Sequence, residues 1–168
     1  MTGRSGLRIE KLHPGLDCRA FDCGKPELNR YLQPFALMNQ KANSAQTYAA
    51  HRDGVVVGYY SLAVGSVEHQ EAPARVGKGL ARHPIPVMIL ARLAVHLGEQ
   101  RAGIGSGLLK DALLRTAAAA KIAGIRAVLV HAKDASAAGF YRHYDFEPCP
   151  FAPNKLMLLM KDLERLVE

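Results

Sequence analysis

The 168-residue chain has few cysteines, no long apolar run and fewer acidic than basic side chains. Its three cysteines, Cys18, Cys23 and Cys149, are too few for a disulfide framework and fit a reducing cytoplasm. Cys18 and Cys23 lack the second Cys/His pair of a zinc site, so we expect no metal. No segment approaches the roughly 18 apolar residues of a membrane span. Residues 1–10 also lack the apolar stretch of a signal peptide, so we expect a cytoplasmic protein without a membrane partner.

Acidic side chains are outnumbered: 22 Lys and Arg stand against 15 Asp and Glu, which leaves a formal net charge of +7. The excess is spread along the chain and forms no basic tail, so folding must assemble any anion-binding surface. Nucleic acid or a nucleotide is the favoured partner, and an ordinary solvated basic surface is the alternative. Length and a hydrophobic content of 49% indicate one domain over residues 1–168.

The apolar patterning predicts a mixed α/β (α+β) sheet domain, with no internal repeat. Asp53-Gly54 predicts a tight hairpin turn, and Pro34 should interrupt a helix that begins at Pro26. The helix that opens at Ile104 should end at Gly124. Strands are expected at residues 7–12, 45–52, 55–64, 87–95, 127–131 and 155–161, further helices at 35–42 and 135–144, and a long loop at 66–86.

A glycine-rich turn between the strand at 87–95 and the next helix is suited to binding phosphate. Gly103 and Gly105 have no Cβ, so the backbone can approach a ligand, and the first N–H groups of the helix can donate to phosphate oxygens. The turn is neither a P-loop nor a dinucleotide fingerprint, because no Gly-Lys-Ser/Thr follows and the spacing is Gly-x-Gly-x-Gly. A plain turn remains the alternative.

A second group of residues follows the strand at 127–131. Small side chains at residues 135–139 leave room for a ligand against the next helix, and Tyr141 is a candidate acid that could protonate a departing thiolate. The alternative for Tyr141 is a half-buried aromatic ring with its hydroxyl in water.

Together these two groups resemble the GNAT superfamily of acyl-CoA-dependent N-acyltransferases. The resemblance implies a central mixed sheet that is split between two parallel strands and flanked by helices. Asp145 departs from the family, where most members have glycine, but Asp tolerates the left-handed conformation. The residues that carry the motifs are Gln100, Gly103, Gly105, Phe140, Tyr141, Tyr144 and Phe146.

A narrower resemblance covers nearly the whole chain, from about residue 7 to residue 160. Residues 58–63, 85–87, 90–95 and 140–141 resemble the acetyltransferase toxins of type II toxin–antitoxin modules (TacT-type). Members of that group acetylate the α-amine of aminoacyl-tRNA and so block translation. The resemblance implies aminoacyl-tRNA as acceptor, a cognate ribbon–helix–helix antitoxin and a homodimer.

The resemblance also implies acetyl-CoA as co-substrate, lying between the strands at 87–95 and 127–131. Amides of the glycine turn would hold its pyrophosphate, and an N–H near Val95 would polarise the thioester carbonyl. Tyr141 would protonate the leaving thiolate after direct attack by the amine. The implied acetyl-CoA contacts are Leu93, Ala94, Val95, Gln100, Arg101, Ala102, Gly103, Ile104, Gly105, Ser106, Asp134, Ala137 and Phe140.

Basic residues in or beside the 66–86 segment are the implied tRNA contacts: Arg75, Lys78, Arg82 and Arg92. An internal salt bridge is the alternative for Arg92. No general base is assigned, because the α-amine of an aminoacyl ester should have a pKa of about 8 or lower. We interpret His131 and His143 as structural residues.

Two other functions stay open. A GNAT enzyme for a small amine, an antibiotic or a protein N-terminus would need acidic residues around the acceptor, whereas the segment before the central strand is basic except for Glu68 and Glu71. A non-catalytic regulator that binds acyl-CoA or nucleic acid would have no use for Tyr141 beside the phosphate turn.

Overall fold

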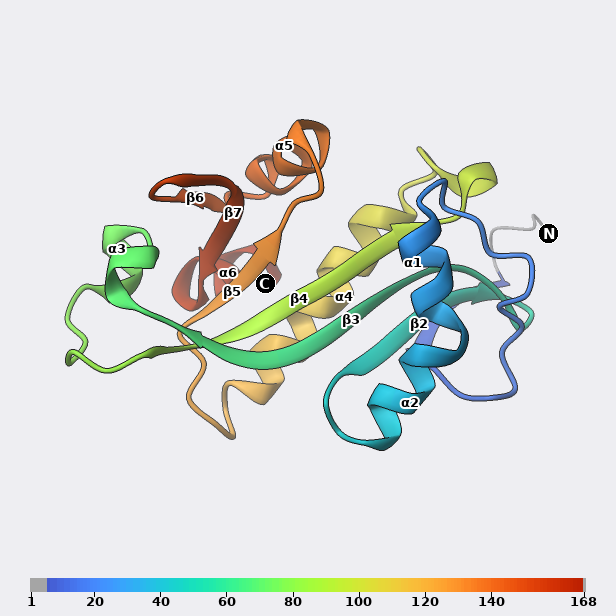
Figure 1. Ribbon diagram of the computed structural model, residues 1–168, viewed down its shortest axis with the longest axis horizontal. Coiled ribbons are helices and arrows are strands. Elements are labelled where there is room, and N and C mark those ends of the chain that lie inside the picture. Colours follow the sequence, from blue (N-terminus) through green and yellow to red (C-terminus); the bar gives the residue numbers. More distant parts are fainter. Residues whose placement is uncertain (1–5, 168) are drawn as a thin grey trace. The chain divides into compact units, whose positions relative to one another are not determined.

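The computed structural model describes residues 6–167 (Figure 1). Strands and helices alternate along most of the chain, as expected for a mixed α/β protein. In chain order the elements are β1 (Leu7–Lys11), α1 (Pro26–Arg30), η2 (Tyr31–Phe35), α2 (Ala36–Lys41), β2 (Gln46–Arg52), β3 (Val55–Val67), η3 (His69–Glu71), α3 (Ala74–Gly77), β4 (Ile85–Val95), η4 (Leu97–Glu99), α4 (Ile104–Ala119), β5 (Ala127–His131), α5 (Ala135–His143), β6 (Glu147–Cys149), β7 (Ala152–Leu159) and α6 (Met160–Val167).

The chain divides into two compact units, each made of two segments. The N-terminal unit comprises Met1–Ala63 and Ala91–Ala112, and the C-terminal unit comprises Val64–Leu90 and Leu113–Glu168. The strands form one sheet in the order β1-β2-β3-β4-β5-β7-β6, in which β4 and β5 are parallel. The expected mixed sheet with flanking helices is therefore confirmed.

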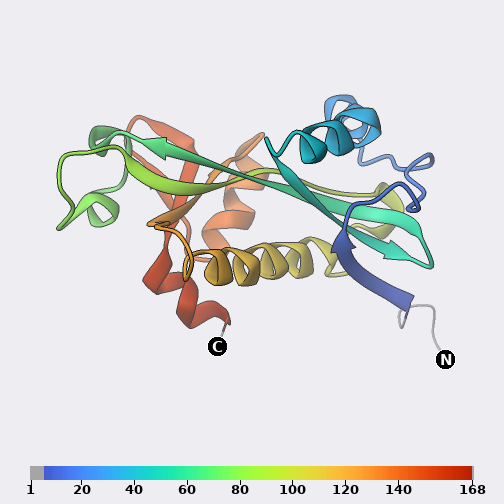
Figure 2. The same ribbon diagram turned by 90° about the horizontal axis from the view of Figure 1, so that it is seen from below.

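The N-terminal unit packs helices on both faces of its strands. Figure 2 shows α1 and α2 on one face of β2 and β3, and the beginning of α4 on the other. Gly58 allows α4 to approach β3, because a Cβ there would lie 2.9 Å from Leu108 Cδ1 and 3.2 Å from the Ala94 carbonyl. The buried hydrophobic cluster of the N-terminal unit includes Leu12, Phe21, Leu28, Tyr31, Leu32, Tyr59 and Ala94. This packing positions the first turn of α4.

The turn between β2 and β3 confirms the hairpin prediction. Asp53 and Gly54 have φ values of 51° and 89°, the left-handed pair that a two-residue hairpin turn requires. The helix that begins at Pro26 is broken beside Pro34, where Gln33 has φ −137° and ψ 119°. Both features arise from local backbone chemistry, so the sequence was sufficient to predict them.

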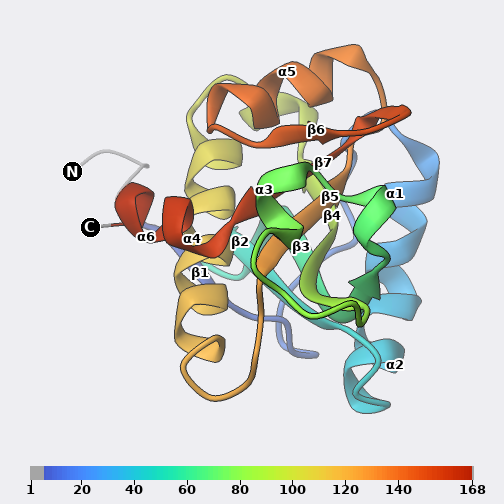
Figure 3. The same cartoon turned by 90° about the vertical axis from the view of Figure 1, so that its left-hand side faces the viewer.

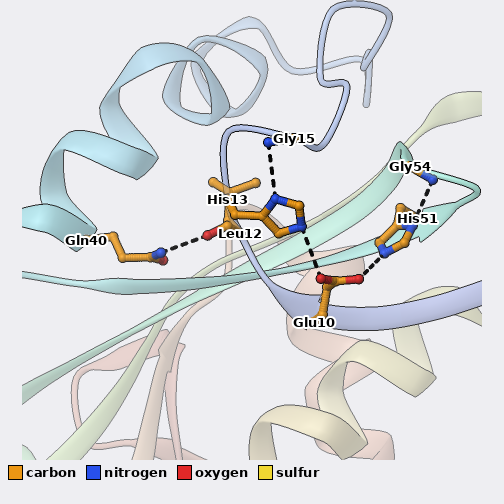
Figure 4. Close-up of polar contacts among 7 residues, drawn as sticks. All are labelled: Glu10, Leu12, His13, Gly15, Gln40, His51 and Gly54. Atoms are coloured by element: carbon orange, nitrogen blue, oxygen red, sulfur yellow. Dashed lines mark hydrogen bonds and ion pairs between the residues drawn. The ribbon is translucent and has the colours of Figure 1, made fainter.

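A carboxylate between two imidazoles ties β1 to this hairpin (Figure 4). Glu10 lies 3.1 Å from His13 Nε2 and 2.6 Å from His51 Nε2. The Nδ1 atoms accept the backbone N–H groups of Gly15 and Gly54, which leaves Nε2 of each ring to carry the proton. The hydrogen bond from His51 is the main reason that the pKa of Glu10 is lowered.

The C-terminal unit has its own core on β4, β5 and β7. Figure 3 shows α5 and α6 beside β7. The parallel register of β4 and β5 runs from Val87 opposite Ala127 to Leu90 opposite Val130, and β4 continues to Val95. The buried side chains of this core include Val67, Val76, Ile85, Val87, Ala127, Leu129, Met157 and Leu159.

The prediction of a long loop at residues 66–86 was wrong. Strand β3 continues to Val67, η3 and α3 follow, and β4 starts at Ile85. The side chains of Glu68 and Glu71 cap each other's backbone, and Val76 is only 2% exposed. A few buried side chains therefore order a segment whose glycines and prolines suggested irregular structure.

The predicted element ends also differ near the C-terminus. Helix α4 ends at Ala119 instead of beside Gly124, and β7 spans Ala152–Leu159 instead of residues 155–161. Neither β6 nor α6 was predicted from the sequence. The first residue of α6, Met160, continues the apolar run of β7, and Leu163 of α6 is fully buried, so the pattern did not separate the strand from the helix that follows.

Candidate active site

The backbone of the glycine turn is shaped to present N–H groups. Arg101 and Gly103 have φ values of 69° and 83°, both in the left-handed region. Left-handed residues in a turn can direct successive N–H groups into a concavity that binds anions, and the helix dipole of α4 adds partial positive charge. Apart from the two adjacent residues of the chain, a Cβ built at Gly103 would have no heavy atom of residues 6–167 within 4 Å, so the space on that side of Gly103 is open. A diphosphate fits these features.

The Gln100 side chain links this turn to β4 by a hydrogen bond. Gln100 Nε2 donates to the Val95 carbonyl at 3.0 Å and lies 3.5 Å from the Cys23 carbonyl. An ion pair between Arg52 and Glu99, with an N–O distance of 3.1 Å, holds η4 just before the turn. Gln100 therefore positions the glycine turn through its side chain.

The last residues of β4 lead into this turn. Ala94 is buried, whereas Leu93 and Val95 are half-buried. Arg92 lies on this segment with its guanidinium carbon 3.5 Å from the centre of the Tyr31 ring. This cation–π contact replaces the internal salt bridge considered for Arg92, which forms no ion pair within residues 6–167.

Tyr141 lies on α5 with its ring in an aromatic cluster. The Phe140 and Phe146 rings lie 5.2 Å and 5.4 Å from it, between ring centres, and Tyr141 is only 8% exposed. Burial raises the pKa of its phenol to about 12. The group is therefore protonated near neutral pH, which is the state that a general acid requires.

The first turn of α5 is capped by Asp134, whose side chain accepts the Ala137 N–H at 2.9 Å. The helix is followed by Asp145, which has φ 69°, so the left-handed conformation expected where the family has glycine is present.

Burial and the nearby Lys155 lower the pKa of His131. The His143 ring packs against Tyr144, with 5.1 Å between ring centres.

The residues assigned to acetyl-CoA fall into two sets. Leu93 to Val95 and Gln100 to Ser106 belong to the N-terminal unit, whereas Asp134, Ala137, Phe140 and Tyr141 belong to the C-terminal unit. The structure brings together the members of each set. Sequence analysis missed Arg52 and Glu99, because their pairing spans 47 positions and leaves no local pattern.

Three of the four basic residues assigned to tRNA lie in the C-terminal unit. Arg75 makes a bidentate ion pair with Asp162, at 2.9 Å and 3.2 Å, while its side chain stays 52% exposed. The Lys78 carbonyl accepts a bond from Arg126 at 3.1 Å. Arg82 lines a cavity of about 540 Å³ with residues 68–70. Arg92 lies in the N-terminal unit.

Across residues 6–167, no cluster of three or more His, Cys, Asp or Glu side chains could hold a metal ion. No helix in the same stretch is long and apolar enough to cross a membrane.

Comparison with known proteins identifies the family. Residues 43–148 match the acetyltransferase (GNAT) domain. The chain belongs to the GNAT family. It is 45% identical over 167 residues to a tRNA-acetylating toxin of Mycobacterium tuberculosis, with 99% of each chain covered.

Two solved structures of the toxin AtaT are also similar to the chain. AtaT complexed with acetyl-methionyl-tRNAfMet has a TM-score of 0.89 and 28% identity, over 96% of this chain and 99% of that one. A mutant AtaT bound to the C-terminus of the antitoxin AtaR and acetyl-CoA has a TM-score of 0.83 and 28% identity, over 96% and 98%.

Proposed function

We propose that this GNAT protein is a toxin that transfers an acetyl group from acetyl-CoA to the α-amine of aminoacyl-tRNA and so blocks translation. The observation that carries the proposal is the 45% identity to a tRNA-acetylating toxin over 99% of both chains. The left-handed glycine turn at the start of α4 and the buried phenol of Tyr141 supply the features that acetyl transfer needs.

Acetyl-CoA supplies an activated acetyl thioester when it is bound. In this proposal, backbone amides from Arg101 to Ser106 hold its pyrophosphate, and the side chain of Gln100 keeps that turn in place. The backbone of Leu93, Ala94 and Val95 binds the pantetheine arm, and the Val95 N–H polarises the thioester carbonyl. The remaining assigned contacts are Asp134, Ala137 and Phe140.

The transfer itself requires one acid from the protein. The lone pair of the α-amine forms the new N–C bond, the C–S bond breaks, and Tyr141 gives its phenolic proton to the sulfur. The proton lost by the nitrogen passes to solvent, from which the phenolate is reprotonated. No base is required, because an amine with a pKa of about 8 is partly neutral near pH 7.

The acceptor side is electropositive in this proposal. Arg75, Lys78, Arg82 and Arg92 contact tRNA phosphates, which contribute affinity and salt dependence without base specificity. The two acidic residues of the same segment serve the fold: Glu71 Oε1 accepts the Glu68 N–H at 2.9 Å, and Glu71 Oε2 lies 3.8 Å from Lys155. This segment therefore offers few carboxylates that could bind a small cationic amine.

The similarity of the chain to toxin–antitoxin proteins extends the proposal to its partners. A similar toxin, AtaT, binds the C-terminus of its antitoxin. We expect a ribbon–helix–helix antitoxin, a homodimer, action in the cytoplasm and a single GNAT domain over residues 1–168.

The deciding experiment is incubation of the protein with total charged tRNA and labelled acetyl-CoA, followed by identification of the acetylated amino acid. Label should appear on the α-amine of at least one aminoacyl-tRNA and should be absent from uncharged tRNA. Acetylation of free amines alone would refute the proposed acceptor.

A further inference from the structure

The tip of the β6–β7 hairpin carries an aromatic ring that the fold does not use. Cys149 pairs with Ala152, so Pro150 and Phe151 form a two-residue connection. Phe151 has φ 61° and an exposed fraction of 103%. Proline followed by a residue with positive φ is the arrangement of a type II turn, whose positive-φ position normally holds glycine.

The other aromatic rings of the C-terminal unit behave differently. Phe140 and Phe146 both pack against Tyr141. Phe151, by contrast, buries no surface and sits in a backbone conformation that disfavours a bulky side chain. Glycine would relieve the strain and remove an exposed apolar ring at no cost in packing. The folded state therefore does not account for phenylalanine at this position.

The hairpin follows closely on α5, the helix that carries the proposed acid. Phe146, which contacts Tyr141, immediately precedes β6, and the three residues of β6 span about 10 Å. The start of β7 lies beside the end of β5, since the Ala132 N–H donates to the Asn154 carbonyl at 2.7 Å. The exposed ring thus lies three residues from Asn154, which is bonded to the segment that leads from β5 into α5, the helix of Tyr141.

We propose that Phe151 is a stacking platform for an unpaired base at the 3′ end of the tRNA, an inference that rests on the proposed function. Unpaired bases at RNA ends are recognised by stacking on exposed aromatic rings, and such stacking tolerates any base because every base has a π-face. A ring presented without packing partners at a hairpin tip meets this requirement. The contact would orient the acceptor end of any charged tRNA.

The test compares wild-type protein with Phe151→Gly and Phe151→Trp in acetylation of charged tRNA. In the glycine variant, KM for aminoacyl-tRNA should rise about 5- to 150-fold, which is the loss of affinity that corresponds to the stacking free energy of one base. KM for acetyl-CoA should not change, and the thermal midpoint should stay equal or rise. Phe151→Trp should keep the wild-type KM for tRNA. Ile122→Ala, at another apolar side chain that is 90% exposed, is the matched control and should change nothing.

A binding assay makes the inference independent of turnover. Wild-type protein should bind uncharged tRNA more tightly than the same tRNA without its unpaired 3′ nucleotides, and Phe151→Gly should abolish that difference. An unchanged preference in the glycine variant would overturn the inference. So would a variant whose only defect is weaker self-association in sedimentation, because Phe151 would then contact a second copy of the chain. Wild-type protein that binds tRNA in this way but acetylates none would instead refute the proposed function.

Discussion

Replacing Tyr141 by phenylalanine removes the proposed acid and little else. The ring keeps its neighbours, because phenylalanine preserves the ring that packs against Phe140 and Phe146. Burial raises the pKa of the phenol to about 12, so at pH 8 about one molecule in 10,000 lacks the proton. Loss of general acid catalysis should lower kcat by about 100- to 10,000-fold, or roughly 2.7–5.5 kcal/mol of transition-state stabilisation.

The assay is steady-state acetylation of charged tRNA between pH 6.5 and 9, with Tyr144→Phe on the same chain segment as the matched control. KM for acetyl-CoA should stay within about threefold of wild type, since the hydroxyl acts on the leaving group. The wild-type rate should rise toward a plateau as the α-amine loses its proton near pH 8, with no decline from the phenol in this range. If Tyr141→Phe has a kcat within threefold of wild type, Tyr141 is not the acid.

Three further predictions concern the scaffold. Gln100→Ala should raise KM for acetyl-CoA up to about tenfold with a smaller change in kcat, since one hydrogen bond that holds the phosphate turn is lost; calorimetric titration with CoA measures it. Gly103→Ala should weaken CoA binding in the same titration and lower stability by about 1 kcal/mol, because φ is 83° there. The pKa of Glu10 is lowered in the folded state, so its contribution to stability is present above the unfolded pKa of 4.5 and is lost as the pH falls through the folded pKa. Glu10→Gln should lack this part of the acid dependence when thermal midpoints are measured against pH.

Local features of the fold were predictable where a few neighbouring residues decide the backbone. Asp53-Gly54 forms the expected hairpin, and the left-handed Gly103 and Asp145 occupy the turns where the sequence motifs place them. The strand at Ala127–His131 has its predicted ends, because an apolar run between polar residues defines it. The segment at 66–86 was mispredicted, since Val76 is ordered by burial against distant strands.

The sequence by itself determined the family and predicted a phosphate-binding turn and a candidate acid, because each depends on residue types at short, fixed spacing. Tertiary structure alone decided what the charged side chains do. Arg75 pairs with Asp162 across 87 positions, and Arg92 stacks on Tyr31 instead of forming a salt bridge. Such partners are chosen by which surfaces the folded strands and helices bring within a few ångströms, and no local pattern encodes that choice. The same holds for Phe151, whose exposure and strain appear only once β6 and β7 are paired.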